Sequence, residues 1–312
     1  MQFAIVTHHA GETNTNLAAR RVEGLDVRLV PPAQAVGLLE PGDVALARLD
    51  VRQTLDGIED GLPTLSHLEE NGIKVLNPPG VLLSAHDKLL TARALERTGL
   101  PHPETEVIGP GATPALRLPL VLKPRFGSWG RDVVLCHNAA ELERWLTELE
   151  TRPWFRTHGA LAQELIPPLG HDLRLVVAAG GVVGAIKRVA APGEWRTNLA
   201  LGGTRVPISP PPAATKLAEA AARSIGADLV GVDLLPTGPG RFSVIELNGA
   251  VDFGPEYSLG PDVFAATLGA FARHVRGDAK VRSQSFASGS LRLAGTNGSV
   301  ARAESSAGQS RG

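Results

Sequence analysis

Residues 231–248 read Gly-Val-Asp-Leu-Leu-Pro-Thr-Gly-Pro-Gly-Arg-Phe-Ser-Val-Ile-Glu-Leu-Asn. Two runs rich in apolar residues flank a Pro/Gly turn, and this pattern predicts two strands joined as a hairpin. If the hairpin is symmetric, Asp233 and Glu246 face each other. Asn248 shares their face because side chains alternate along a strand. The opposite, core-facing side is then predicted to hold Val232, Leu234, Ile245 and Leu247.

The oxygen-rich face of this hairpin has two interpretations. Two carboxylates directly across a strand pair repel each other unless something neutralises them. A cluster of Asp, Glu and Asn oxygens with no nearby His or Cys suits a hard cation such as Mg²⁺, with Mn²⁺ as a substitute. The other interpretation is a pair of solvated acids on an exposed hairpin, and both fit this segment.

The composition limits the class of protein and its partners. The 312 residues include 31 basic and 32 acidic ones, with a pI near 6.8, which gives no electrostatic reason to expect nucleic acid or an anionic membrane as a partner. Cys136 is the single cysteine, so an intramolecular disulfide framework is excluded. We expect no export signal and no membrane span, because the start lacks a basic segment and no apolar run approaches about 18 residues. These features predict a cytoplasmic protein.

The first hundred residues read as an α/β domain followed by a helix. Short strands are predicted at 3–6, 27–30, 44–46 and 74–76, separated by helical or loop segments, one of them a helix near 16–21. This alternation predicts a parallel sheet. One long helix is predicted from Val81 to Arg97, where Gly99 and Pro101 end it.

The pattern changes to hairpins from Leu120 onward. One hairpin is predicted at 173–178 and 182–189, turning on Gly180-Gly181, and helices are predicted at 213–225 and 263–276. After Gly277 the chain becomes rich in Ser, Gly, Ala and Arg, which predicts a disordered tail over residues 278–312.

Two further segments could carry ligands. Lys123 ends an apolar strand and precedes a loop with Gly127 and Gly130, where backbone N–H groups and an ammonium could bind phosphate. A plain hairpin with a loose turn is the alternative. The Walker A and Gly-x-Gly-x-x-Gly patterns are absent, so P-loop and Rossmann cofactor sites lose their main support. Asp172 and Arg174 share a strand face, either as a structural salt bridge or as a ligand pair.

The order of these motifs resembles the ATP-grasp carboxylate–amine ligases, and within them the RimK-like and LysX-like branch. The matching stretches cover roughly residues 40 to 275 and are Asn77-Pro78, His86-Asp87-Lys88, Leu122-Lys123-Pro124, Gly127-Ser128-Trp129-Gly130-Arg131, Gln163-Glu164, Asp172-Leu173-Arg174, Trp195-Arg196-Thr197-Asn198, Gly202-Gly203, Asp233 and Glu246-Leu247-Asn248.

The resemblance implies a fold of mixed α/β and α+β class in which two ATP-grasp lobes sandwich ATP. The implied parts are an N-terminal pre-ATP-grasp α/β domain (1–84), a central lobe (85–165), a C-terminal lobe with the metal site (166–277) and the tail (278–312). The resemblance further implies that ATP is bound by Lys88, Lys123, Glu164, Leu165, Asp172, Arg196, Thr197 and Asn198. It implies that Mg²⁺ is held by Asp233, Glu246 and Asn248, and that Arg196 is catalytic.

The activity implied is an ATP-dependent ligase that forms a C–N bond through an acyl phosphate. It would add an amino acid, glutamate or a similar one, to a carboxylate-bearing acceptor such as a small acidic carrier protein, a peptide or a small molecule. A homo-oligomer is compatible with the resemblance. The sequence departs from the family at Leu201 and at residues 249–253, where substrates are expected, so the substrates stay open. The alternatives are another ATP-grasp ligase of the peptide-forming or glutathione-synthetase-like kind, and a non-catalytic ATP-binding regulatory protein.

Overall fold

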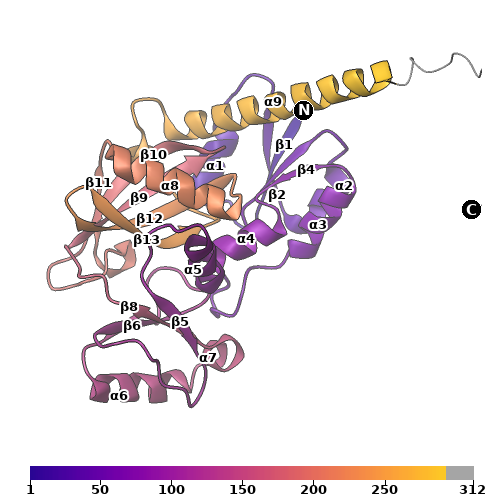
Figure 1. The fold of residues 1–312 in the computed structure, drawn as a ribbon. Helices are drawn as coiled ribbons and strands as arrows, with labels where there is room; N and C mark the ends of the chain where they lie inside the picture. Colours follow the sequence, from indigo (N-terminus) through magenta and orange to yellow (C-terminus); the bar gives the residue numbers. More distant parts are fainter. Residues whose placement is uncertain (293–312) are drawn as a thin grey trace, which may run out of the picture. The chain divides into compact units, whose positions relative to one another are not determined.

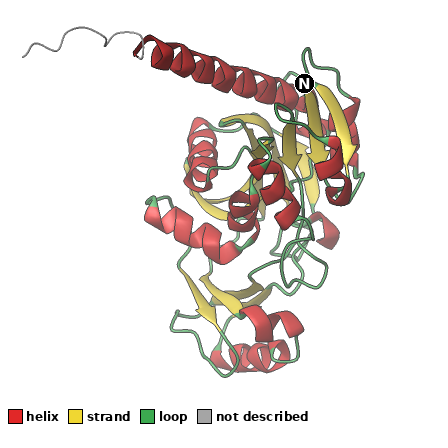
Figure 2. Ribbon diagram, turned by 90° about the vertical axis from the view of Figure 1, so that its right-hand side faces the viewer, coloured by secondary structure: helices red, strands yellow, loops and turns green. Residues whose placement is uncertain are grey.

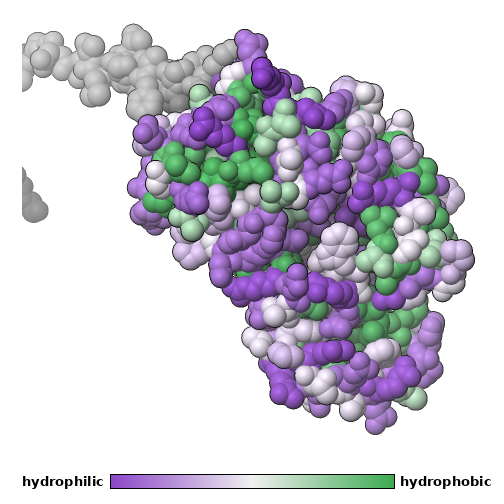
Figure 3. All heavy atoms as spheres, turned by 180° about the vertical axis from the view of Figure 1, so that it is seen from behind, coloured by the Kyte–Doolittle hydropathy of each residue, from purple (hydrophilic) through white to green (hydrophobic). Residues whose placement is uncertain are grey.

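The computed structural model describes residues 1–292, with side chains described up to residue 277. Residues 1–272 form one compact unit, and a second unit begins at Arg273. Within the first unit, the described strands form three sheets, each built from a different stretch of the chain (Figure 1). Hydrophilic side chains cover most of the face drawn in Figure 3, and apolar ones gather there in small groups.

The first sheet is parallel, as the alternation of strands and helices predicted. Its strands are ordered β2-β1-β3-β4. They are β1 (Gln2–Val6), β2 (Asp26–Val30), β3 (Val44–Ala47) and β4 (Lys74–Leu76). The connecting helices are α1 (Glu12–Ala19), α2 (Pro32–Leu38) and α3 (Leu62–Glu70). Helices α2 and α3 were not predicted, although both carry a proline in the first turn, a typical helix start.

The single helix predicted from Val81 to Arg97 is wrong, because the chain forms two helices there. They are α4 (Pro79–His86) and α5 (Lys88–Arg97). Asp87 separates them with an extended backbone, and its Oδ1 accepts a hydrogen bond from Leu89 N at 3.0 Å. This is helix N-capping, which starts a new helix at Lys88. The break therefore places Lys88 in the first turn of α5.

The second sheet is antiparallel and carries helices of its own. Its order is β5-β8-β6-β7. The strands are β5 (Thr105–Ile108), β6 (Leu120–Pro124), β7 (Val134–Cys136) and β8 (Ala160–Glu164), and the helices are α6 (Ala139–Leu149) and α7 (Pro153–His158). These elements form the lobe at the bottom of Figures 1 and 2. Its core packs Trp154 and Phe155 of α7 against Leu122 of β6.

The third sheet is antiparallel and has the order β11-β10-β9-β12-β13. Its strands are β9 (His171–Ala178), β10 (Gly181–Val189), β11 (Thr204–Pro207), β12 (Leu229–Gly238) and β13 (Arg241–Asn248). The tight turn between β9 and β10 consists of Ala179 and Gly180, both with positive φ, so it lies one residue earlier than predicted. Helix α8 (Pro212–Ile225) buries a row of alanines against this sheet: Ala214, Ala218, Ala221 and Ala222.

The first sheet lies within residues 2–76, the second within 105–164 and the third within 171–248. The chain also forms two short 3-10 turns, η1 (Leu199–Leu201) and η2 (Pro255–Tyr257). Helix α9 (Val263–Arg292) continues past Gly277, where the tail was expected to begin, and no proline interrupts the sequence between 278 and 292. Residues 293–312 of that expected tail lie outside the described residues. No helix within residues 1–292 has the length and apolar composition needed to cross a membrane.

Candidate active site

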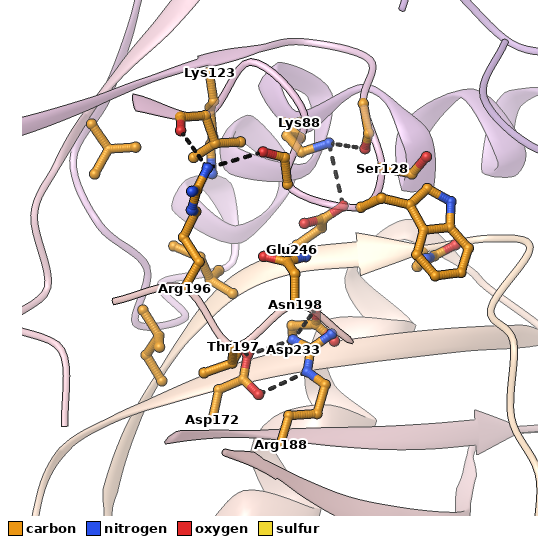
Figure 4. A pocket seen from close by; sticks show the side chains of 18 of the residues that line it. Lys88, Lys123, Ser128, Asp172, Arg188, Arg196, Thr197, Asn198, Asp233 and Glu246 are labelled. Carbon is orange, nitrogen blue, oxygen red and sulfur yellow. Dashed lines mark hydrogen bonds and ion pairs between the residues drawn. The ribbon is translucent and has the colours of Figure 1, made fainter. Parts of the chain in front are cut away.

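The residues predicted for the ATP and metal sites line a single pocket, although they come from helix α5, from strands of the second and third sheets and from loops. They are Lys88, Lys123, Glu164, Leu165, Asp172, Arg196, Thr197, Asn198, Asp233, Glu246 and Asn248. Figure 4 shows most of them converging from facing elements. The sequence-based grouping of these residues is therefore matched by their positions in space.

Strands β12 and β13 form the acidic hairpin, and their register beside Asp233 and Glu246 is the predicted one. Asp233 of β12 pairs directly with Glu246 of β13, and Gly231 pairs with Asn248. The pairing then shifts, because Leu234 lies opposite Val244 and leaves Ile245 as an extra residue. A β-bulge of this kind breaks the alternation of side chains. Ile245 consequently lines the pocket, and its predicted place in the core is wrong; Val244, 1% exposed, is buried there instead.

Two arginines, the buried Arg188 and the half-buried Arg174, neutralise the carboxylates on this sheet. Arg174 Nε and Nη2 donate to the two oxygens of Asp233, each at 2.7 Å. Arg188 Nη2 donates to Asp233 Oδ2 at 2.8 Å, and Arg188 also forms a two-point ion pair with Asp172. Burial alone would disfavour the ionised Asp233, but the two guanidinium groups outweigh it and hold its pKa well below the usual range.

Asp172 and Arg174, which share a strand face, do not pair with each other. Each instead bonds to a residue on a neighbouring strand, so the network crosses three strands. Thr197 joins it by donating from Oγ1 to Asp172 at 2.7 Å. Arg188 was not among the residues predicted for the site. Its position opposite Asp172 in the β9–β10 register is the signal that identifies it.

Two lysines from the central part of the chain point into the same pocket. Lys88 Nζ donates to the carbonyl of Gly127 at 2.6 Å and lies 3.2 Å from Glu246 Oε1. Lys123 Nζ donates to Gln163 Oε1 at 2.7 Å. Burial lowers the pKa of Lys123 to about 8, and the charge of Lys88 acts in the same direction, while Glu246 and Asp233 oppose it. Both ammonium groups are placed to meet an anion in the pocket.

The glycine-rich loop, residues 125–133 between β6 and β7, contacts the segment that holds Arg196. Arg196 Nη1 donates to the carbonyl of Val133 at 3.1 Å, and its Nε and Nη2 bind the two oxygens of Glu194 at 3.0 and 2.9 Å. The hydrogen bonds from Arg196 lower the pKa of Glu194 to about 2. Gly130 has φ of 71°, and a Cβ added there would lie 2.8 Å from Asn198 Oδ1, so this position requires glycine.

The pocket has a volume of about 190 Å³, whereas small-molecule sites usually enclose about 300–1,000 Å³. Glu164 ends β8 and Leu165 follows it, and the pocket lining there also includes the apolar Val121, Ile166 and Leu235. A nucleotide base suits these apolar side chains, and its phosphates suit the lysine and arginine side chains of the pocket.

The oxygen donors of the hairpin suit a hard cation bound together with phosphates. No group of three or more His, Cys, Asp or Glu side chains occurs among the described residues in an arrangement for a metal. The oxygen donors present are the carboxylates of Asp233 and Glu246 and the amide of Asn248. Lys or Arg forms an ion pair with each carboxylate. Mg²⁺ characteristically binds one or two carboxylates and completes its coordination with substrate phosphates and water. The donor set therefore fits Mg²⁺ that arrives with a nucleotide.

Comparison with known proteins places this geometry in a family. The "Glutamate--LysW ligase ArgX" of Sulfurisphaera tokodaii is 31% identical over 192 residues, which are 60% of this chain and 68% of that protein. A "Probable alpha-L-glutamate ligase" of Parasynechococcus marenigrum is 33% identical over 211 residues, 65% of this chain, and the match spans only 44% of that relative.

A solved structure extends the similarity beyond the sequence matches. The RimK-domain ATP-grasp protein of Sphaerobacter thermophilus superimposes with a TM-score of 0.61 and 25% identity, covering 86% of this chain and 99% of that one. The family description "RimK-like ATP-grasp domain" matches residues 85–261, more than half of the chain and every residue of the predicted ATP and metal sites. The chain thus belongs to the RimK-like family of ATP-grasp enzymes, which are ATP-dependent carboxylate–amine ligases.

Proposed function

We propose that this protein uses ATP to join the amino group of an amino acid, glutamate or a similar one, to the carboxylate of a second molecule. The observation that supports it best is the convergence of Lys88, Lys123 and the Asp233–Glu246–Asn248 donor set on one pocket. Cationic groups for phosphates and hard oxygen ligands for Mg²⁺ are the two requirements of phosphoryl transfer from ATP. The named glutamate ligases among the relatives support glutamate as one substrate.

The reaction proceeds in two steps with the protein as a positioning scaffold. In the first step, a carboxylate oxygen of the acceptor attacks the γ-phosphorus of ATP, the bond to the β-phosphate oxygen breaks, and ADP leaves an acyl phosphate. In the second step, the amine nitrogen attacks the carbonyl carbon, the C–O bond to phosphate breaks, and the nitrogen loses a proton. Lys88, Lys123 and Arg196 stabilise the negative charge on the transferring phosphoryl group.

The remaining residues of the pocket hold the nucleotide and the cation. Glu164 and Leu165 contact the nucleoside, and Asp172, Thr197 and Asn198 line the phosphate side. Mg²⁺ held by Asp233, Glu246 and Asn248 would neutralise charge on the phosphates. The acceptor carboxylate belongs to a peptide, a small acidic carrier protein or a small molecule. The dependence on ATP and the buried free thiol of Cys136 favour the cytoplasm.

A hydroxylamine screen tests this function even while the natural amine is unidentified, because hydroxylamine takes the place of that amine. The protein is incubated with ATP, Mg²⁺ and hydroxylamine in the presence of free amino acids, peptides with a free carboxyl terminus, and small acidic carrier proteins. An activated carboxylate is trapped as a hydroxamate with one ADP released per hydroxamate. ADP release that no carboxylate stimulates, with no hydroxamate formed, would show that the protein is not a carboxylate–amine ligase.

A further inference from the structure

A second hollow of about 520 Å³ lies beside the nucleotide pocket. The loops that follow β1 and β3 contribute His9, Asp50 and Glu59 to its lining, and the glycine-rich loop contributes Trp129 and Arg131. Asp50 and the loop residues line both spaces. A molecule in the second hollow can therefore reach the reaction centre past Asp50.

The topology of the first sheet explains why side chains gather at this point. His9 follows the end of β1, and Asp50 follows the end of β3. These two strands are neighbours in the order β2-β1-β3-β4, and β1 is the strand at which the chain changes its direction of winding. In open parallel sheets, ligands bind outside the carboxyl ends of the strands at such a switch point.

Asp50 differs from the other acids of the reaction centre in its lack of a cationic partner. Asp172, Asp233 and Glu246 each form an ion pair with Arg or Lys. Within the described part of the chain, no Lys or Arg forms an ion pair with Asp50, whose Oδ1 accepts a hydrogen bond from Val51 N at 2.7 Å. A carboxylate facing a hollow without a cation is suited to bind one from a ligand.

The surroundings of Asp50 reinforce this property. Burial raises the pKa of its carboxyl group, and the negative charges of Glu59 and Asp252 raise it further, against the Val51 N–H and the more distant Arg48. Arg48 is hydrogen-bonded elsewhere, with Nη2 donating to the carbonyl of Val251 at 2.8 Å. Glu59 Oε2 accepts from the backbone N of Asp50 at 2.9 Å and so fixes its position.

We propose that Asp50 binds the ammonium group of the incoming amino acid in the second hollow, with Arg131 on the facing loop receiving its carboxylate. The proposal rests on the ligase function proposed above and assigns the amine substrate to a place beside the nucleotide pocket. Asp50 forms no covalent bond; it positions the nitrogen on the side of the pocket from which an acyl phosphate can be attacked.

Separate measurement of the two half-reactions tests this assignment. Hydroxamate formation is measured with the acceptor carboxylate that gives most product in the screen, and amide formation with L-glutamate as the amine. We expect Asp50→Asn to raise the KM for L-glutamate by about tenfold or more, as expected for the loss of a charge-assisted contact, and to lower hydroxamate formation much less. Asp26→Asn, an exposed acid on β2 outside both hollows, is the matched control and should change neither.

A second measurement uses the unaltered protein, in case Asp50→Asn does not fold. L-2-Hydroxyglutarate has a hydroxyl group in place of the ammonium group of L-glutamate, and we expect it not to compete with L-glutamate at concentrations near the KM of the amine. Competition at those concentrations, or an unchanged KM for L-glutamate in folded Asp50→Asn, would overturn the role of Asp50 and leave the ligase function standing. An equal loss of hydroxamate and amide in that variant would also overturn it. Failure of the wild type to form any hydroxamate would instead overturn the ligase function and this inference together.

Discussion

Lys88 and Glu246 form an ion pair across the pocket, with 3.2 Å between Nζ and Oε1. The same ammonium group donates to the carbonyl of Gly127 at 2.6 Å. One lysine thus joins the acidic hairpin of the third sheet to the glycine-rich loop of the second. Nucleotide phosphates would compete with Glu246 for Lys88 and leave the carboxylate free for a cation. Each of these charges therefore has an opposite charge beside it both with and without nucleotide.

The first prediction concerns Glu246 as a metal ligand. We expect Glu246→Ala to lower Mg²⁺-dependent ADP formation at least about hundredfold, because metal-assisted charge stabilisation contributes several kcal/mol to such transition states. The fold should survive, because the Glu246 side chain is partly exposed and Lys88 keeps its hydrogen bond to the carbonyl of Gly127. ADP release is measured beside thermal melting, with Glu143→Ala on the exposed side of α6 as the control. Mg²⁺-dependent turnover at the wild-type rate would rule out Glu246 as a ligand.

The second prediction is a pH dependence caused by Lys123. Its pKa in the folded protein is about 8, below its ordinary value of 10.5. As the pH rises through 8 the ammonium loses its charge, so we expect nucleotide affinity to fall by at most about tenfold per pH unit. Titration calorimetry with a non-hydrolysable ATP analogue measures this, and Lys123→Arg should abolish the fall because a guanidinium stays protonated. An affinity independent of pH in the wild type would contradict the prediction.

The same depressed pKa of Lys123 makes the protein more stable as the pH rises, whereas it weakens nucleotide binding. Because its folded pKa is depressed, the unfolded chain binds the proton more tightly between pH 8 and 10.5. The contribution of this group to the free energy of unfolding therefore rises with pH across that window and is constant below it. Urea denaturation of the wild type and of Lys123→Met should show this difference in slope, whereas parallel slopes would indicate that the buried ammonium is not perturbed.

The third prediction concerns the stability of the buried network around Arg188. Arg188, 5% exposed, binds both Asp172 and Asp233, so Arg188→Met would leave Asp172 without its guanidinium partner. Removing one member of a buried ionic network typically costs about 3–5 kcal/mol. We expect a loss of this size in urea denaturation, against a change within about 0.5 kcal/mol for Arg97→Met at the exposed end of α5. A loss under about 1 kcal/mol for Arg188→Met would show that the network contributes little to the fold.

Local periodicity was sufficient to predict much of the site. Asp233, Glu246 and Asn248 share a face because the strand repeat operates over only a few residues on each side of the turn. Ile245 was misplaced because one extra residue in β13 reverses the alternation, and nothing in the apolar run marks where the bulge falls. The break at Asp87 was missed because the residues on both sides of it favour helix, although Asp is a common N-cap.

Other parts of the site depend on contacts that are distant in the sequence. Asp50 reaches the pocket only through the order of the strands in the first sheet, which a pattern of short apolar runs does not specify. The pairing of Arg174 with Asp233 likewise requires β9 to lie beside β12. The resemblance to a known family supplied the grouping of residues that periodicity alone could not.

The fourth prediction concerns Glu194, which occupies two donors of Arg196 in the structure. If Arg196 binds phosphate during turnover, Glu194 must be displaced and therefore competes with the nucleotide. We expect Glu194→Gln to lower the KM for ATP by a few fold, because the amide keeps the shape but loses the charge that strengthens the pair. Steady-state kinetics measure this, and a raised KM would mean that Glu194 orients Arg196 for the nucleotide and does not compete with it.

The last prediction separates a catalytic Arg196 from a structural one. Arg196 also donates to the carbonyl of Val133 and so helps to hold the glycine-rich loop, which a structural arginine would do as well. A planar guanidinium binds phosphate oxygens at two points, whereas an ammonium keeps the charge but not the fork. If this two-point contact with phosphate forms mainly in the transition state, Arg196→Lys should lower kcat by about ten- to hundredfold and raise the KM for ATP much less. Kinetics and thermal melting on one preparation decide between the roles, since a near-normal kcat with a depressed melting temperature would leave Arg196 only the task of holding the loop.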